Sequence, residues 1–206
     1  MLNDIKWLFF DVGSTLVDET ECYNHRIRDA IAGTDITFEE FNEKRLYFSK
    51  QNLKGDIEAL RYFGLAKTPW HHEDEKLYKD SENVLKILCE KGYRIGAIAN
   101  QSAGTEKRLE SYGLMKYIQL VVASAEEGVA KPDKRIFDIA LKRAVCSPSE
   151  AVMIGDRVDN DIIPAKEMGM MTIWVRQGFG KYWTISDESE KADFAVDSLS
   201  ELLDIF

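Results

Sequence analysis

The sequence predicts an α/β fold: a mostly parallel sheet covered by helices on both faces, with a small α-helical insertion. Short apolar runs suited to buried strands recur along the chain, and stretches with apolar residues three and four positions apart lie between them. Strands that alternate with helices of about 10 to 15 residues indicate βαβ units. After the first apolar run, roughly 60 residues contain no convincing strand, which indicates a helical insertion.

Each expected strand is a run of mainly apolar residues. The strands cover residues 5–12, 93–99, 118–123, 151–154 and 171–175, with an edge strand over residues 192–196. Amphipathic helices are expected around residues 84–88, ended by Gly92, and 136–141, opened by Pro132 and Asp133. Open α/β sheets bind ligands beyond the carboxyl ends of their strands, so a site is expected at this edge.

The insertion covers residues 18–77 and carries three expected helices, over residues 21–32, 38–50 and 56–63. Residues 1–17 and 78–206 then form the core domain. A helical segment inserted directly after the first strand is expected to lie over the active end of the sheet and to act as a lid.

Composition excludes several classes of protein. A chain of 206 residues with 45% apolar and 31% charged residues is typical of a soluble globular protein. The net charge of −9 disfavours binding to nucleic acid and to anionic membranes. We expect a cytoplasmic protein, because no apolar run suits a membrane span and MLNDIKWLFF does not resemble a secretory signal. Cys22, Cys89 and Cys146 are expected to be reduced, and either a monomer or a homodimer is compatible with the sequence.

Polar residues follow four of the expected strands. They are Asp11 after the first strand, Asn100 in AIANQS, Lys131 in GVAKPD, and Asp156, Asp159 and Asp161 in IGDRVDND. Mg²⁺-assisted phosphoryl transfer needs oxygen ligands for a hard cation, a carboxylate that attacks phosphorus, and a lysine that neutralises charge. These fragments, in this order, predict that chemistry.

The chain resembles the haloacid dehalogenase superfamily, in the phosphatase-like branch whose helical cap follows the first strand. The matching motifs are WLFFDVGSTLVD, YRIGAIANQS, GVAKPDKRIF and IGDRVDNDIIPAKEMGM, which span nearly the whole chain. The resemblance implies a Rossmann-like three-layer core and a small phosphorylated metabolite as substrate.

The resemblance also implies a role for each site residue. Asp11 is the expected nucleophile, which forms an aspartyl-phosphate, and Lys131 bridges this nucleophile and the phosphate. Mg²⁺ is expected at Asp11, Asp156 and the backbone carbonyl of Gly13. Asp161 is expected either to orient Lys131 or to hold a metal-bound water. Candidate substrate-binding residues are Asn100, Gln101 and Lys131. The simpler interpretation of Asn100 is a residue that forms a turn, and that of Gln101 is a surface residue.

Two positions depart from the family pattern. Phosphatases of the family carry a second Asp where this chain has Gly13, and that Asp protonates the leaving alkoxide and activates the attacking water. They also carry Ser or Thr where this chain has Ala99. General acid or base catalysis contributes about 10²- to 10⁴-fold, and a hydrogen bond to a charged group about 1.5 to 3 kcal/mol. We therefore expect slow turnover of alkyl phosphates, or specialisation for leaving groups that need no proton.

Three alternatives remain open at this stage. The first is a metal- and phosphate-binding or regulatory protein that has lost turnover. The second is a phosphonate-cleaving enzyme that uses a cap lysine, with Lys44, Lys50 and Lys54 as candidates. The third concerns a replacement acid from the cap, for which Tyr23 and His25 are candidates, whereas His71 and His72 are interpreted as part of a solvated linker.

Overall fold

A six-stranded sheet forms the centre of the computed structural model, which describes residues 4–206. Residues 1–3, where the segment tested for a secretory signal begins, lie outside the described residues. All neighbouring strands are parallel, in the order β5-β4-β1-β6-β7-β8. The strands are β1 Trp7–Phe10, β4 Arg94–Ala99, β5 Ile118–Ala123, β6 Ala151–Gly155, β7 Met171–Val175 and β8 Phe194–Val196. This confirms the predicted α/β fold.

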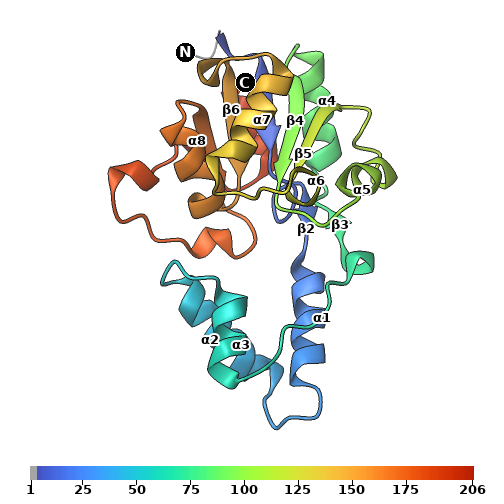
Figure 1. Cartoon of the computed structure of the whole chain (residues 1–206), viewed down its shortest axis with the longest axis vertical. Helices are drawn as coiled ribbons and strands as arrows, with labels where there is room; N and C mark the ends of the chain where they lie inside the picture. Colours follow the sequence, from blue (N-terminus) through green and yellow to red (C-terminus); the bar gives the residue numbers. More distant parts are fainter. Residues whose placement is uncertain (1–3) are drawn as a thin grey trace.

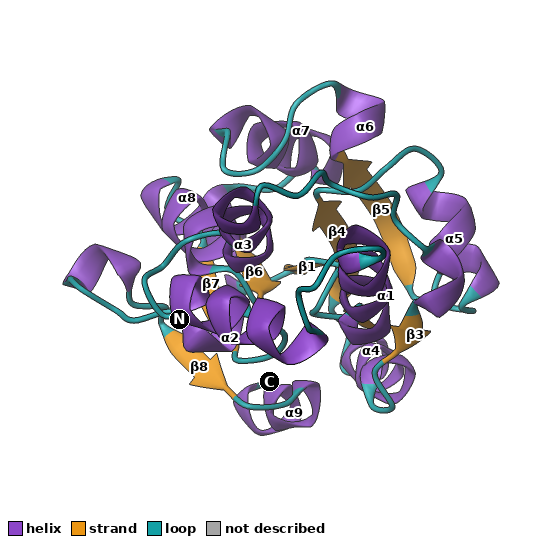
Figure 2. Cartoon of the chain, turned by 90° about the horizontal axis from the view of Figure 1, so that it is seen from below, coloured by secondary structure: helices purple, strands orange, loops and turns teal. Residues whose placement is uncertain are grey.

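Helices cover both faces of the sheet (Figure 2). They are α4 Ser81–Glu90, α5 Thr105–Ser111, α6 Ser124–Glu127, α7 Lys134–Ala144, α8 Ile163–Glu167 and α9 Leu202–Ile205. Short helical turns are η2 His72–Asp74, η3 Pro148–Glu150, η4 Val158–Ile162, η5 Gly180–Tyr182, η6 Glu188–Glu190 and η7 Leu199–Glu201. In residues 4–206 no helix has the length and apolarity that crossing a membrane requires.

Alternation along β1 divides the core into two layers. Leu8 and Phe10 pack in one hydrophobic cluster with Leu85 of α4, whereas Phe9 packs in the other with Phe137 of α7. All five side chains are fully buried. Successive side chains of a strand point to opposite faces, so a strand buried on both faces needs apolar residues at every position. The continuous apolar run WLFF therefore occupies the centre of the sheet.

The helical insertion lies below the carboxyl ends of the strands in Figure 1. Its helices are α1 Thr20–Ile31, α2 Phe38–Ser49 and α3 Gly55–Phe63, close to the expected ranges. Ile27, Phe41, Ala59 and Leu60, one or more from each helix, form a small separate core. At the start of α2 the hydroxyl of Thr37 accepts a hydrogen bond from the Glu40 amide, completing a capping box.

The expectation that residues 18–77 contain no strand is wrong. β2 Val17–Asp18 pairs antiparallel with β3 Lys76–Leu77, so the insertion leaves and rejoins the core through a two-stranded ribbon. Each strand has two residues, too few to produce a recognisable alternation of apolar and polar side chains. The first core strand is also shorter than expected, because the ladder stops at Phe10.

A tight loop joins β1 to β2 and folds the chain back on itself. The amide of Ser14 donates to the carbonyl of Val17 at 2.7 Å, and the amide of Val17 donates to the carbonyl of Val12 at 2.9 Å. The hydroxyl of Ser81, at the start of α4, donates to the carbonyl of Leu16 at 2.7 Å. These bonds return the backbone to Gly13, with which Val17 forms an isolated bridge.

We expect Phe137→Ala to lower the free energy of unfolding by about 3 to 5 kcal/mol, because it removes a fully buried ring between α7 and the sheet. Lys142→Ala, on the exposed side of the same helix, removes one surface ion pair with Asp138 and should cost about 0.5 kcal/mol or less. Chemical denaturation measures both, and equal effects of the two variants would contradict this packing.

Candidate active site

A cavity of about 400 Å³ lies between the carboxyl ends of β1, β4 and β6 and the helical insertion. Residues from all four polar fragments line it, together with residues of the insertion and of the loop after β7. From the sheet side these are Asp11, Gly13, Asn100, Gln101, Lys131, Asp156 and Asp161. The strand ends therefore bring together every site residue expected from the sequence.

The ammonium group of Lys131 is the centre of the site. Its Nζ donates to Asp11 Oδ1 at 2.6 Å, to Asp161 Oδ1 at 2.6 Å and to the carbonyl of Ile98 at 2.7 Å. Three partners satisfy all three N–H bonds of an ammonium group. Burial lowers the pKa of Lys131, but the charges of Asp11 and Asp161 outweigh that effect and raise it overall. Lys131 is therefore a permanent cation at neutral pH.

Asp156, in contrast, receives no hydrogen bond from Lys131. Its carboxylate is buried, and Oδ1 has no hydrogen-bond partner among the described residues. Burial, followed by repulsion from Asp11 and Asp161, raises the pKa of Asp156 well above its usual value. A buried polar atom without a partner indicates a missing ligand, water or ion.

Oxygen atoms of Asp11, Asp156 and Asp161 lie within 4.8 Å of one another. Mg²⁺ prefers oxygen ligands and is commonly bound through one or two carboxylates. The unpartnered oxygen of Asp156, next to Asp11, fits such an ion.

Both carboxylate oxygens of Asp161 already have partners. Oδ1 accepts from Lys131 and Oδ2 accepts from the amide of Arg157 at 3.0 Å. A Cβ at Gly155 would lie 2.3 Å from Oδ2, so this carboxylate packs against a position where only glycine fits. Of the two roles expected for Asp161, these bonds favour the orientation of Lys131, and its metal-binding role remains a prediction.

Asn100 and Gln101 also have partners within the protein. Nδ2 of Asn100 donates to the carbonyl of Lys131 at 2.8 Å, and the amide of Lys131 donates to Oδ1 of Asn100 at 2.7 Å. The side chain of Gln101 contacts Glu19 and Arg108. Both residues line the cavity, and their binding of substrate stays a prediction. Their hydrogen bonds hold Lys131 and Glu19, two other residues that line the cavity.

Glu19 is the residue that sequence reasoning missed. It is 8% exposed, lines the cavity and precedes α1 as its N-cap residue. Burial, followed by the negative charge of Asp11, raises the pKa of Glu19 to about 8. The available signal was its position two residues after Val17, because a tight turn after Gly13 brings such a residue back beside the first motif.

The insertion contributes the opposite wall of the cavity. Tyr23 lines this wall, whereas His25 does not. The interpretation of His72 as a linker residue is incomplete: it lines the cavity, with Nδ1 2.6 Å from Glu75 Oε1 and Nε2 3.1 Å from Ser102 Oγ. The phosphonatase candidates Lys44, Lys50 and Lys54 do not line the cavity, and the lysine of the insertion that does is Lys67.

A second group of potential metal ligands, His25, Asp29 and His71, lies on the surface of the insertion. The two imidazole rings are stacked with centroids 3.5 Å apart and planes 4° apart. A metal ion lies close to the plane of each imidazole that binds it, and two stacked parallel rings do not share such a position. This arrangement does not fit an ion bound by both rings.

Comparisons with known proteins agree with this geometry. Residues 5–169 match the family described as haloacid dehalogenase-like hydrolase. Glyceraldehyde 3-phosphate phosphatase of Methanocaldococcus jannaschii is 30% identical, over 98% of this chain and 96% of the relative. Pyrimidine 5'-nucleotidase YjjG of Escherichia coli is 40% identical, over 89% and 95% of the two chains.

Solved structures show the same fold. The magnesium-bound crystal structure of YfnB, a HAD hydrolase of Bacillus subtilis, superposes with a TM-score of 0.69 at 18% identity. The superposition covers 98% of each chain.

We expect Asp156→Asn to raise the unfolding temperature of the metal-free protein by a few degrees, because burial and two neighbouring carboxylates disfavour ionisation of Asp156 in the folded state, and Asn does not ionise. Mg²⁺ at about 100 times its Kd should stabilise the wild type by about 2.7 kcal/mol, or roughly 5 to 10 °C, and this rise should disappear in the variant. The control is Asp159→Asn. The carboxylate of Asp159 pairs with Arg157, so this variant should keep the Mg²⁺ response. A full response in Asp156→Asn would exclude Asp156 as a ligand.

Proposed function

The chain belongs to the haloacid dehalogenase-like hydrolases, and we propose that it is a Mg²⁺-dependent phosphatase that forms an aspartyl-phosphate on Asp11. One observation carries the proposal: in the lining of a cavity, a buried lysine holds Asp11 beside a buried Asp156 that has an unpartnered oxygen. An ion pair that only stabilises the fold does not need an additional carboxylate without a partner. A site that receives a cation and an anionic substrate needs such a carboxylate to bind the cation.

Asp11 would act as the nucleophile through the oxygen that Lys131 does not hold. It attacks the phosphorus atom, and the bond between phosphorus and the ester oxygen of the substrate breaks. Lys131 remains beside the reacting oxygens, so its positive charge stabilises the phosphoryl group during transfer. Asp161 and the carbonyl of Ile98 fix the direction of this charge.

Asp11, Asp156 and the backbone carbonyl of Gly13 are the residues that would hold Mg²⁺. The bound ion supplies positive charge to the phosphoryl oxygens. Lys131 offsets part of the charge of the three buried carboxyl groups, and an ion held by these residues would offset the rest, so that an anionic substrate could approach.

The substrate we propose is a small primary phosphate ester. The relatives are named for glyceraldehyde 3-phosphate and for pyrimidine 5'-nucleotides, both of which carry phosphate on a primary carbon. The cavity of about 400 Å³ is within the range of small-molecule sites. We further propose that residues 18–77 form the cap, because Tyr23, Arg26 and Trp70 from this segment close the cavity away from the sheet.

Reduced turnover remains part of the proposal. Ala99 ends β4 fully buried in the hydrophobic cluster and offers no hydroxyl to the phosphoryl group. Gly13 offers no carboxylate of its own. How far the missing carboxylate at position 13 slows turnover depends on whether another group supplies the proton.

We expect Mg²⁺-dependent phosphate release from at least one member of a panel of alkyl, aryl and acyl phosphates, and Asp11→Asn should abolish it. Chelation of the metal should also abolish it, and added Mg²⁺ should restore it. Phosphate release measured over the panel checks this result. Activity that survives Asp11→Asn would contradict the proposed nucleophile. No release from any substrate would support the alternative of a binding or regulatory protein.

We expect Ala99→Ser to raise kcat/KM for alkyl phosphates by roughly tenfold, because it restores a hydrogen bond worth about 1.5 to 3 kcal/mol to a charged group. Ala97→Ser is the matched control: neither alanine lines the cavity and both are fully buried, but Ala99 directly precedes the cavity residue Asn100, whereas Ala97 lies two residues earlier on β4. An equal response of the two variants would show that the missing hydroxyl does not limit the reaction.

A further inference from the structure

Gly13 lies against the carboxyl group of Glu19. A Cβ built on Gly13 would lie 2.4 Å from Glu19 Oε1, 2.7 Å from its Cδ and 2.7 Å from its Oε2. All three nearest atoms belong to one carboxyl group. The space that any side chain at position 13 would enter is therefore occupied by the carboxylate of Glu19.

The backbone does not require glycine at this position. Gly13 is absent from the residues with positive φ, so its conformation is open to other amino acids. The obstacle to a side chain at position 13 is the carboxylate of Glu19. A side chain at position 13 and the present position of the Glu19 carboxylate therefore exclude each other.

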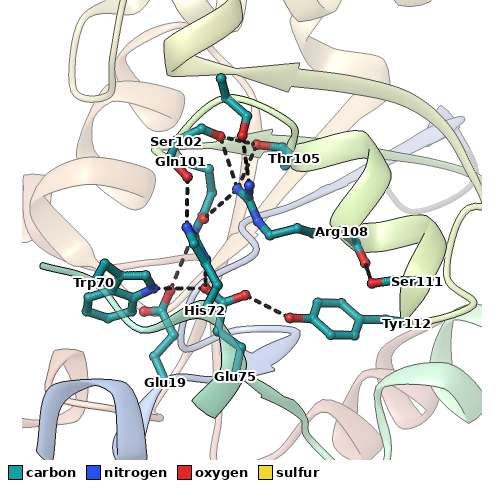
Figure 3. Close-up of polar contacts among 11 residues, drawn as sticks. Glu19, Trp70, His72, Glu75, Gln101, Ser102, Thr105, Arg108, Ser111 and Tyr112 are labelled. Atoms are coloured by element: carbon teal, nitrogen blue, oxygen red, sulfur yellow. Dashed lines mark hydrogen bonds and ion pairs between the residues drawn. The ribbon is translucent and has the colours of Figure 1, made fainter. Parts of the chain in front are cut away.

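Glu19 is held in place from the core side of the cavity. Nε2 of Gln101 donates to Glu19 Oε1 at 3.3 Å, and Arg108 donates to the other end of the same amide, Gln101 Oε1, at 3.2 Å (Figure 3). Because Arg108 is only a donor, it fixes which end of the amide faces Glu19. Ser14 Oγ lies 3.4 Å from Glu19 Oε2.

We infer that Glu19 is the general acid and base of the phosphatase, in place of the missing carboxylate at position 13. This inference rests on the function proposed above. The carboxylate stands within the cavity that contains Asp11, and it fills the volume that a side chain at position 13 would enter. It is supplied by the residue that opens α1, so one element carries both the proton donor and the first helix of the cap.

The proton balance has two steps. As Asp11 bonds to phosphorus and the ester bond breaks, protonated Glu19 gives its proton to the departing alkoxide, which leaves as an alcohol. Ionised Glu19 then takes a proton from a water molecule that attacks the phosphorus of the aspartyl-phosphate. The bond between phosphorus and Asp11 breaks, phosphate leaves, and both carboxyl groups return to their initial states.

The two roles predict different behaviour with different leaving groups. In Glu19→Gln, kcat for an alkyl phosphate should fall by about 10²- to 10⁴-fold, because the first step needs the acid. With an aryl phosphate whose leaving group needs no proton, the first step should persist. Rapid mixing should then show a burst of phenol stoichiometric with the enzyme, followed by slow release of phosphate.

Three further variants complete the test. Gly13→Asp alone should not raise activity, because its side chain meets Glu19. Gly13→Asp combined with Glu19→Ala moves the carboxylate back to position 13 and should restore alkyl phosphate turnover to within about tenfold of the wild type. Glu21→Gln, on the exposed face of the first turn of α1, is the control and should leave turnover unchanged. An unchanged thermal response to Mg²⁺ verifies that each variant is folded.

The outcomes separate this inference from the proposed function. If Asp11→Asn abolishes activity but Glu19→Gln turns over alkyl phosphates at the wild-type rate, the inference is wrong and the phosphatase proposal stands. Equal losses on alkyl and aryl phosphates, with no burst and no rescue by the relocated carboxylate, would reduce Glu19 to a structural role and also overturn it. Activity insensitive to Asp11→Asn overturns both.

Discussion

The geometry of the site depends on the three hydrogen bonds of the Lys131 ammonium. Its two carboxylate partners come from the loop after β1 and from the helical turn η4 after β6, and its carbonyl partner, Ile98, lies in β4, so one buried cation connects segments of three neighbouring strands. Removing one member of a buried ion pair is costly because the remaining charge is left uncompensated. The arrangement therefore fixes Asp11, the proposed nucleophile, in place and leaves its second oxygen without a bond to Lys131.

The cluster of Asp11, Asp156, Asp161 and Lys131 contains more acidic groups than basic groups. Three carboxyl groups lie around one ammonium group, and burial together with the two acidic neighbours raises the pKa of Asp156 and so disfavours its ionisation. In the proposed function this site binds a cation, and a functional site that reduces the stability of its scaffold is the usual relation between the two. The second-motif residue Asn100 supports the lysine by holding its backbone.

The position of Glu19 changes how the glycine at position 13 is interpreted. Taken alone, a glycine at that position indicates a lost catalytic group. In the folded protein the tight loop returns the chain to the same place, and the carboxylate of Glu19, at the start of the helical insertion, occupies the vacant volume. The interpretation then moves from an impaired enzyme to one whose proposed acid is Glu19, the N-cap residue of α1, with Ala99 as the remaining departure from the family pattern.

The sequence by itself determined the α/β class, the order of the strands along the chain, the three helices of the insertion and the four polar fragments at the strand ends. Apolar periodicity and motif spacing are local properties, and burial of a continuous apolar run leaves few alternatives. The short ribbon β2–β3, the lining role of His72 and the proximity of Glu19 to Gly13 were decided only by the tertiary structure. Each depends on a turn or a pairing between segments, and a volume shared by two residues is not encoded in the type of either one.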